Sequence, residues 1–329
     1  MNFSTDFKRK VLYTKPELFN DLALELFNWQ SQHNLIYQKY LSYLKVDPSA
    51  IENFKQIPCL PIEFFKHHRI LSSISSEAIK TFESSGTTGQ TRSIHYVSDV
   101  NWYHQVSEAI FNQQWGELQD YHIFALLPSY LERNNSSLVS MANYFIQQSD
   151  SPYSGFYLDN YQQLIEAVEN ARQAKGRVLL LGVTFALLYL ADRFSLNWPD
   201  VVVMETGGMK GRGEELTRTE VHQLLKKNLD LHSVASEYGM TELLSQAYAH
   251  ESGEFVSPPW MKVLIRDIYD PFSYVPTGKQ GGINIIDLAN IDSCAFIETK
   301  DLGRLTTNSL FEVLGRYDNS EIRGCNLMI

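Results

Sequence analysis

Apolar positions in the first 80 residues recur at the three- and four-residue spacing of amphipathic helices. The clearest run is PELFNDLALELFNWQSQHNLIYQKYLSYL, and prolines then interrupt the segment IPCLPIEFFKHHRI. From Lys80 onward, short apolar runs such as HIFALLPS, RVLLLGV and WPDVVVMETGG alternate with helical stretches. We therefore predict a helical N-terminal cap over residues 1–80 and a layered α/β core over residues 81–314.

Local signals delimit two of the predicted helices. One runs from about Asn160 to Lys175 and ends before Gly176. Its apolar face is formed by four residues, Leu164, Ile165, Val168 and Ala171. The other begins at Thr217 and Glu220, which have the spacing of a reciprocal helix cap, and it carries the apolar residues Val221, Leu224 and Leu225. The last third of the chain, which includes GKQGGINIIDLAN and FEVLGRYD, is typical of strands.

Composition and charge narrow the range of functions. With 329 residues and 44% hydrophobic content, the chain can bury a large core. A formal net charge of −10 opposes binding to nucleic acid and to anionic membranes. We expect a cytoplasmic protein without an integral membrane segment, because no apolar run has the length of a signal peptide core or a spanning helix.

The densest group of candidate ligand-binding residues is a polar loop in which four hydroxyls and two glycines fall within six positions. These residues are Ser84, Ser85, Gly86, Thr87, Thr88 and Gly89. Glycine allows the backbone N–H groups to approach an anion closely, and hydroxyls add further donors to phosphate oxygens. The loop lacks the lysine-containing pattern of a Walker A motif. An ordinary polar surface turn is the alternative interpretation.

The segment SSGTTG resembles the signature phosphate loop of the adenylate-forming superfamily, which includes acyl-CoA synthetases and phenylacetate-CoA ligases. The resemblance implies the α/β fold of that superfamily, in which layered sheets and helices surround an ATP site. A lysine usually follows the loop in that superfamily, whereas this chain has Arg92.

A second motif, EYGMTE, resembles the YGxTE segment of the same superfamily. The resemblance implies that Tyr238 and Gly239 line the adenine pocket, that Thr241 contacts the α-phosphate, and that Glu242 helps to hold Mg²⁺. Carboxylate and phosphate oxygens are the ligands that this hard cation prefers. The alternative is a helix start with a buried tyrosine and a solvated glutamate.

Three further short matches follow the superfamily's order. Gly207 and Gly208 resemble the glycine-bearing wall of the adenine site. The segment TKDLGR resembles the TGDLGR motif, which implies that Asp301 binds the ribose hydroxyls and that Arg304 lies in the nucleotide site. Arg316 is the second residue of the segment GRYD, which resembles the GRxD hinge, and it is a candidate catalytic cation. The usual C-terminal domain, which we expect to be missing here, carries a catalytic lysine, and Arg304 and Lys210 are the alternative replacements for that lysine.

We predict that residues 315–329 form a hinge remnant and a tail that carries Cys325. A chain that stops near the hinge with a terminal cysteine resembles the acyl-protein synthetases of bacterial bioluminescence, in which that cysteine carries the acyl group. A thiolate is a strong nucleophile toward an acyl adenylate, and the nearby arginines lower a thiol pKa. A spectator thiol is the alternative. Cys59 and Cys294 lie in apolar contexts, so we expect them in the core.

The resulting hypothesis is an ATP- and Mg²⁺-dependent ligase that activates a fatty acid and captures it as a thioester on Cys325. The expected partners are a fatty acid and an acyl-acceptor protein of reductase or carrier type. A ligase that passes the acyl group to coenzyme A and a non-catalytic nucleotide- or partner-binding subunit are the alternatives. The segment Gly182–Leu188 is either part of an acyl channel or a buried strand leading into a core helix.

Overall fold

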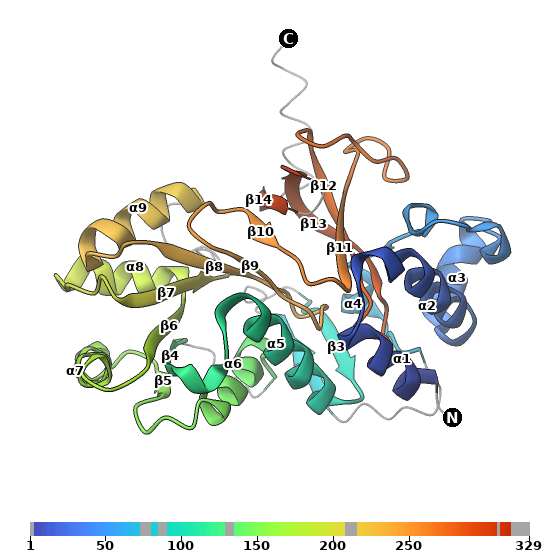
Figure 1. Ribbon diagram of the computed structural model, residues 1–329. Coiled ribbons are helices and arrows are strands. Elements are labelled where there is room, and N and C mark those ends of the chain that lie inside the picture. Colours follow the sequence, from blue (N-terminus) through green and yellow to red (C-terminus); the bar gives the residue numbers. More distant parts are fainter. Residues whose placement is uncertain are drawn as a thin grey trace, which may run out of the picture. The chain divides into compact units, whose positions relative to one another are not determined.

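The computed structural model (Figure 1) describes residues 3–72, 80–84, 91–128, 135–207, 216–307 and 310–316. The chain packs as two compact units. The first contains Met1–Asp99, Glu242–Ser245 and Val256–Ile329, and the second contains Val100–Thr241 and Gln246–Phe255. The helices expected as an N-terminal cap therefore share a unit with the last strands of the chain.

The first unit begins with helices and short turns, as the apolar spacing predicts. The α-helices are α1 (Phe3–Leu12), α2 (Phe19–His33), α3 (Leu35–Tyr43) and α4 (Phe64–His67). Short 3₁₀ turns are η1 (Pro16–Leu18), η2 (Pro48–Ala50) and η3 (Phe54–Gln56). Helix α3 starts at Asn34, whose side chain accepts a hydrogen bond from the Tyr37 N–H at 3.0 Å.

Four antiparallel strands form the main sheet of the first unit. They are β11 (Met261–Arg266), β12 (Gln280–Asp287), β13 (Phe296–Leu305) and β14 (Leu310–Arg316), in that order, and the short β1 (Leu60–Pro61) pairs in parallel with β13. A separate antiparallel pair joins β2 (Lys80–Glu83) to β3 (Ile94–Val97). The β-rich character predicted for the last third is confirmed.

Side chains from helix α2 satisfy the backbone of the turn between β12 and β13. Gln30, fully buried, donates to the carbonyls of Asn290 and Ile291 and accepts from the Ala295 N–H, all at 2.9–3.0 Å. Phe27 meets the Phe296 ring edge-on at 6.0 Å. The helices are therefore a structural part of the sheet that contains β13.

The second unit is built on five parallel strands. They are β4 (Tyr121–Leu126), β5 (Gly155–Tyr157), β6 (Arg177–Val183), β7 (Val201–Thr206) and β8 (Val234–Tyr238), and they lie in the order β5-β4-β6-β7-β8. Strand β9 (Ala247–Ala249) runs antiparallel beside β8, and β10 (Phe255–Val256) follows it. Every residue of β4 is buried, as expected for a parallel sheet covered on both faces.

Helices alternate with these strands, which confirms the predicted α/β pattern. They are α5 (Val100–Trp115), η4 (Leu118–Asp120), α6 (Ser137–Gln148), α7 (Tyr161–Arg172), α8 (Thr184–Arg193) and α9 (Arg218–Leu229). Strand, helix and parallel strand follow one another from β4 to β8, so the carboxyl ends of all five strands lie along one edge. Segments that leave this edge are placed to bind ligands.

Both predicted helices form, although one predicted apolar residue on each of them is not buried. In α7 three of the four predicted apolar residues are buried, and Gly176 follows the helix with a left-handed φ of 133°. The cap formed by Thr217 and Glu220 on α9 is present. Leu224, however, is 41% exposed, because it lies beside the buried stripe of Val221, Leu225 and Leu229 rather than on it. Within the described residues, no helix is both long and apolar enough to cross a membrane.

Candidate functional site

The predicted phosphate loop lies between β2 and β3, and its two ends are joined by hydrogen bonds. The Ser84 N–H donates to the Ser93 carbonyl at 3.0 Å, and the Ser93 N–H donates to the Ser84 Oγ at 3.0 Å. The loop is therefore closed at its base. Five of its six predicted phosphate-binding residues, Ser85, Gly86, Thr87, Thr88 and Gly89, lie outside the described part of the chain.

Glu242, the predicted metal ligand, is buried near this base with an exposed fraction of 4%. Burial raises the pKa of its carboxyl, and the neighbouring charge of Asp301 also raises it, while a side-chain hydrogen bond with Ser93 and the charge of Arg316 act in the opposite direction. The net pKa lies above its usual value. The buried carboxylates of Glu242 and Asp301 lie close together, and this favours the binding of a cation, which would offset the negative charge of both.

Asp301 and Arg316 face each other across β13 and β14. They are partners in the strand register, and the Arg316 Nε lies 3.2 Å from the Asp301 Oδ1. The Asp301 side chain is largely buried, whereas the Arg316 side chain is 74% exposed. The first unit thus brings together Ser84, Glu242, Asp301 and Arg316, four of the residues that the sequence singled out.

Three residues that the sequence analysis missed hold the chain around Glu242. Asn290 Nδ2 donates to the Glu242 carbonyl at 2.8 Å. Asp287, completely buried at the end of β12, accepts from the N–H groups of Leu244 and Ser245 at 2.9–3.0 Å. Ser93 is the third, because it contacts both the loop base and Glu242. Only a weak sequence signal pointed to them, since Asn, Asp and Ser are common in turns.

These residues fit a magnesium ion that arrives with a nucleotide. No group of three or more His, Cys, Asp or Glu side chains within the described ranges forms a metal site. Mg²⁺ in nucleotide sites needs only one or two protein carboxylates, because phosphates and water supply the remaining oxygens. Glu242, with Asp301 close by, meets that requirement.

In the second unit, the other predicted nucleotide residues follow the carboxyl ends of β7 and β8. Gly207 has a left-handed φ of 79° directly after β7, which only glycine adopts at low cost. Tyr238 ends β8 and is 8% exposed, with its ring 5.7 Å from that of Phe255. Gly239 and Thr241 come next in the chain. Gly208 lies outside the described residues.

Gly239 is required by the side chain beneath it. A Cβ added there would lie 2.3 Å from the Glu237 Oε1. Glu237 is buried, and its carboxylate accepts a short hydrogen bond from the Thr206 hydroxyl at the end of β7. The absence of a side chain at position 239 therefore allows a buried carboxylate to tie β8 to β7 at the edge where ligands are expected.

A second buried carboxylate, Glu205, lies on β7 next to the start of α8. Burial raises its pKa, but hydrogen bonding to His222 and the charge of Arg218 outweigh burial, and the net pKa is lowered. The Thr184 hydroxyl also donates to it at 3.0 Å. The segment Gly182–Leu188, considered above as an acyl channel, forms the end of β6 and the start of α8. A Cβ at Gly182 would lie 2.7 Å from the Leu187 side chain.

The remaining predicted residues have other partners or lie outside the description. Arg304 is exposed and forms an ion pair with Glu312 on β14, and Arg92 lies 3.3 Å from Glu83. Cys59 and Cys294 are buried free thiols, as expected for core residues. Cys325, the predicted acyl carrier, and Lys210 lie outside the described residues.

Comparison with known proteins identifies a family that the chain resembles. The family model described as acyl-protein synthetase, LuxE, matches residues 5–106. A curated long-chain-fatty-acid–luciferin-component ligase from Aliivibrio fischeri is 21% identical, with 91% of this chain and 85% of the relative covered. The predicted resemblance to the acyl-protein synthetases is thus confirmed.

Solved structures confirm the fold. An open conformation of 2-hydroxyisobutyryl-CoA ligase, in complex with 2-HIB-AMP and CoA, matches with a TM-score of 0.69 at 11% identity, over 95% of this chain and 70% of that one. ATP-bound MatB from Rhodopseudomonas palustris matches with a TM-score of 0.55 at 15% identity, over 74% of this chain and 50% of that one. The chain therefore has the fold of the adenylate-forming ligases.

Proposed function

We propose that this chain is an ATP-dependent acyl-protein synthetase that activates a long-chain fatty acid and holds the acyl group as a thioester on Cys325. The observation that carries the proposal is the cluster in the first unit. There the base of the predicted phosphate loop, the buried Glu242 and the pair Asp301–Arg316 lie together. The similarity to a long-chain-fatty-acid–luciferin-component ligase supports the substrate class.

In the first step, a fatty acid carboxylate oxygen attacks the α-phosphorus of ATP. A bond from that oxygen to phosphorus forms, the bond to the β-phosphate oxygen breaks, and pyrophosphate leaves. Ser84 and the loop after it would hold the phosphates, and Thr241 the α-phosphate. Glu242 would hold Mg²⁺, which supplies charge stabilisation as phosphoryl oxygens become more negative. Asp301 would accept hydrogen bonds from the ribose hydroxyls.

In the second step, the Cys325 thiolate attacks the acyl carbonyl carbon. A carbon–sulfur bond forms, the bond to the phosphate oxygen of the adenylate breaks, and AMP leaves with the electron pair. The thiol must first lose its proton, and an arginine such as Arg316 favours the thiolate electrostatically. The proposed acceptor of the acyl group is a partner protein of reductase or carrier type.

The decisive experiment follows radiolabelled fatty acid in the presence of ATP and Mg²⁺. We expect label on the protein that is released by hydroxylamine, absent from Cys325→Ser and retained in the matched variant Cys294→Ala. ATP–pyrophosphate exchange, which reports the first step alone, should persist in Cys325→Ser and be lost in Glu242→Gln. Label that stays on Cys325→Ser contradicts the assignment of the thiol.

A coenzyme A ligase is the second candidate, because the solved 2-hydroxyisobutyryl-CoA ligase that shares the fold is described in complex with CoA. The same labelling experiment separates the two. Label found only on added coenzyme A, with none on the protein, favours the second candidate. Absence of ATP–pyrophosphate exchange with acids of every chain length would leave a non-catalytic binding subunit.

A further inference from the structure

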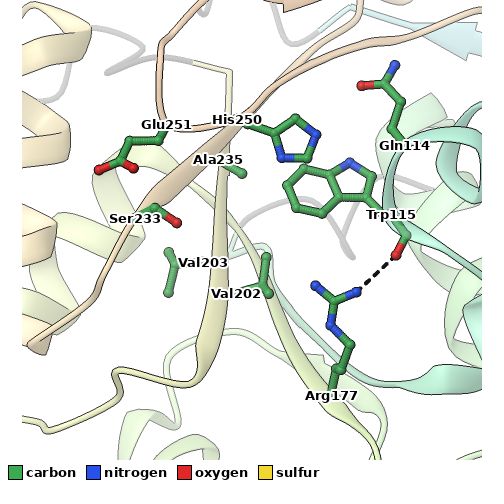
Figure 2. A pocket seen from close by; sticks show the side chains of 9 residues that line it. All are labelled: Gln114, Trp115, Arg177, Val202, Val203, Ser233, Ala235, His250 and Glu251. Atoms are coloured by element: carbon green, nitrogen blue, oxygen red, sulfur yellow. Dashed lines mark hydrogen bonds between the residues drawn. The ribbon is translucent and has the colours of Figure 1, made fainter.

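The second unit contains a cavity of about 260 Å³ at the amino ends of its parallel strands (Figure 2). Arg177 is the first residue of β6, Val203 lies near the start of β7, and Ser233 immediately precedes β8. Trp115 closes one side from the end of α5. The edge of the sheet with the predicted nucleotide residues Gly207 and Tyr238 is the opposite one, so this cavity is a separate site.

Arg177 is held in a fixed orientation within the cavity wall. Its guanidinium lies over the Tyr121 ring, 4.7 Å from the centroid, and donates one hydrogen bond to the Trp115 carbonyl at 3.0 Å. No carboxylate in the described part of the chain forms an ion pair with it. The guanidinium N–H groups that do not bind the Trp115 carbonyl have the geometry to donate hydrogen bonds to the two oxygens of a carboxylate.

The charges around the cavity leave Arg177 uncompensated. Glu251 lies on the other side, but its carboxylate pairs with Lys226 at 2.8 Å. Burial and the charge of Arg177 lower the pKa of His250, so its imidazole is neutral at neutral pH. A bound anion would therefore meet one positive charge without an opposing negative one.

Two rings and an apolar floor form the rest of the site. The His250 ring lies against the Trp115 indole, with centroids 4.1 Å apart, while Val202 and Ala235, which share one face of the sheet, form the floor. The Trp115 Nε1 is buried without a hydrogen-bond acceptor among the described residues. A buried donor without an acceptor is unfavourable. Movement of the exposed His250 ring would open that donor to an oxygen of a ligand.

We propose that this cavity binds a small monocarboxylate with a flat apolar body, its carboxylate on Arg177 and its body between the Trp115–His250 wall and the floor. The volume of the cavity limits the size of the ligand. Pockets for drug-sized ligands span roughly 300–1,000 Å³, so a single ring fits here and a long acyl chain does not. The site is therefore distinct in ligand as well as in position from the one proposed for the fatty acid.

Benzoate is a suitable probe, and benzamide is its neutral control of nearly the same shape. The full-length chain is titrated with each compound at constant ionic strength, and binding is followed by calorimetry and by the thermal unfolding midpoint. We expect saturable binding of benzoate and a binding constant for benzamide weaker by about tenfold or more, since the charged hydrogen bonds are lost. Equal binding of the two compounds, or no saturable benzoate signal, overturns the proposal.

Two variants and a control test the residues. Arg177→Gln removes the cation, but Arg177 also caps the end of α5, so this variant is paired with Ser233→Phe, which fills the cavity from its rim. Both should abolish benzoate binding. The control is Arg193→Gln, because Arg193 is an exposed arginine that likewise lies over a tyrosine ring, at 5.3 Å. If Ser233→Phe folds and binds benzoate as tightly as the parent chain, the ligand does not occupy this cavity.

Discussion

Substitution of Gly239 by alanine tests the contact between the nucleotide segment and the buried carboxylate beneath it. The added Cβ would lie 2.3 Å from the Glu237 Oε1, closer than real Cβ contacts, so the carboxylate must move by about 1 Å. That movement breaks the hydrogen bond from Thr206. Hydrogen bonds to charged groups contribute about 1.5–3 kcal/mol, and alanine regains about 0.4–1 kcal/mol by restricting the unfolded chain. We therefore expect a net loss of about 1–2 kcal/mol.

The assay is the free energy of unfolding from urea titration, with Gly155→Ala as the matched control. A Cβ at Gly155 would meet only the Tyr157 ring at 3.8 Å, an ordinary contact, so this variant should be neutral or slightly stabilising. In a Glu237→Ala background the Gly239→Ala penalty should disappear, because the clashing oxygen is gone. A penalty of the same size in both backgrounds would refute the reasoning.

The remaining predictions concern four buried side chains. Burial gives the Glu242 carboxyl a pKa above its ordinary 4.5, so the folded chain binds this proton more tightly than the unfolded chain does. The free energy of unfolding should therefore fall as the pH rises from 4.5 through the raised pKa. Glu242→Gln should remove this pH dependence and lower the rate of ATP–pyrophosphate exchange by about a hundredfold or more. Exchange that survives in this variant contradicts the assigned role. Asp287→Asn should lower the free energy of unfolding in urea by about 2–4 kcal/mol, although the two side chains have the same shape. The reason is that an NH₂ group replaces a carboxylate oxygen that accepts hydrogen bonds from backbone N–H groups. An unchanged midpoint of urea unfolding would contradict this reasoning. Burial raises the pKa of Cys59 and Cys294, so neither should react with iodoacetamide at pH 8 in the folded chain, as mass mapping of the modified peptides can check.

The parts of the fold that depend on local signals could be predicted from the sequence. Apolar spacing identified the N-terminal helices, the buried runs identified β4, β6 and β7, and the cap on α9 was visible as Thr217 and Glu220. The exception on that helix, Leu224, shows the limit of a local pattern. Which apolar residue lies at the border of a buried stripe depends on the neighbouring elements rather than on spacing.

The site could be predicted only through its motifs. Glu242 and Asp301 were assigned from short segments, but their proximity depends on the register of β13 with β14 and on the turn held by Asp287. Ser93 and Asn290 were missed because their role comes from contacts that are distant in sequence, as between Asn290 and the Glu242 carbonyl. No periodicity encodes such contacts. They arise when the chain is folded.

The discontinuous first unit has a consequence for the order of folding during synthesis. Its first 99 residues emerge from the ribosome before the strands β11–β14 against which α2 packs, and the second unit is synthesised in between. At a synthesis rate of about 5–20 residues per second, on the order of ten seconds or more pass before Phe27 can contact Phe296 and Gln30 can bind the turn before β13. The second unit can fold first, whereas the first unit can be completed only when its last strands have been synthesised.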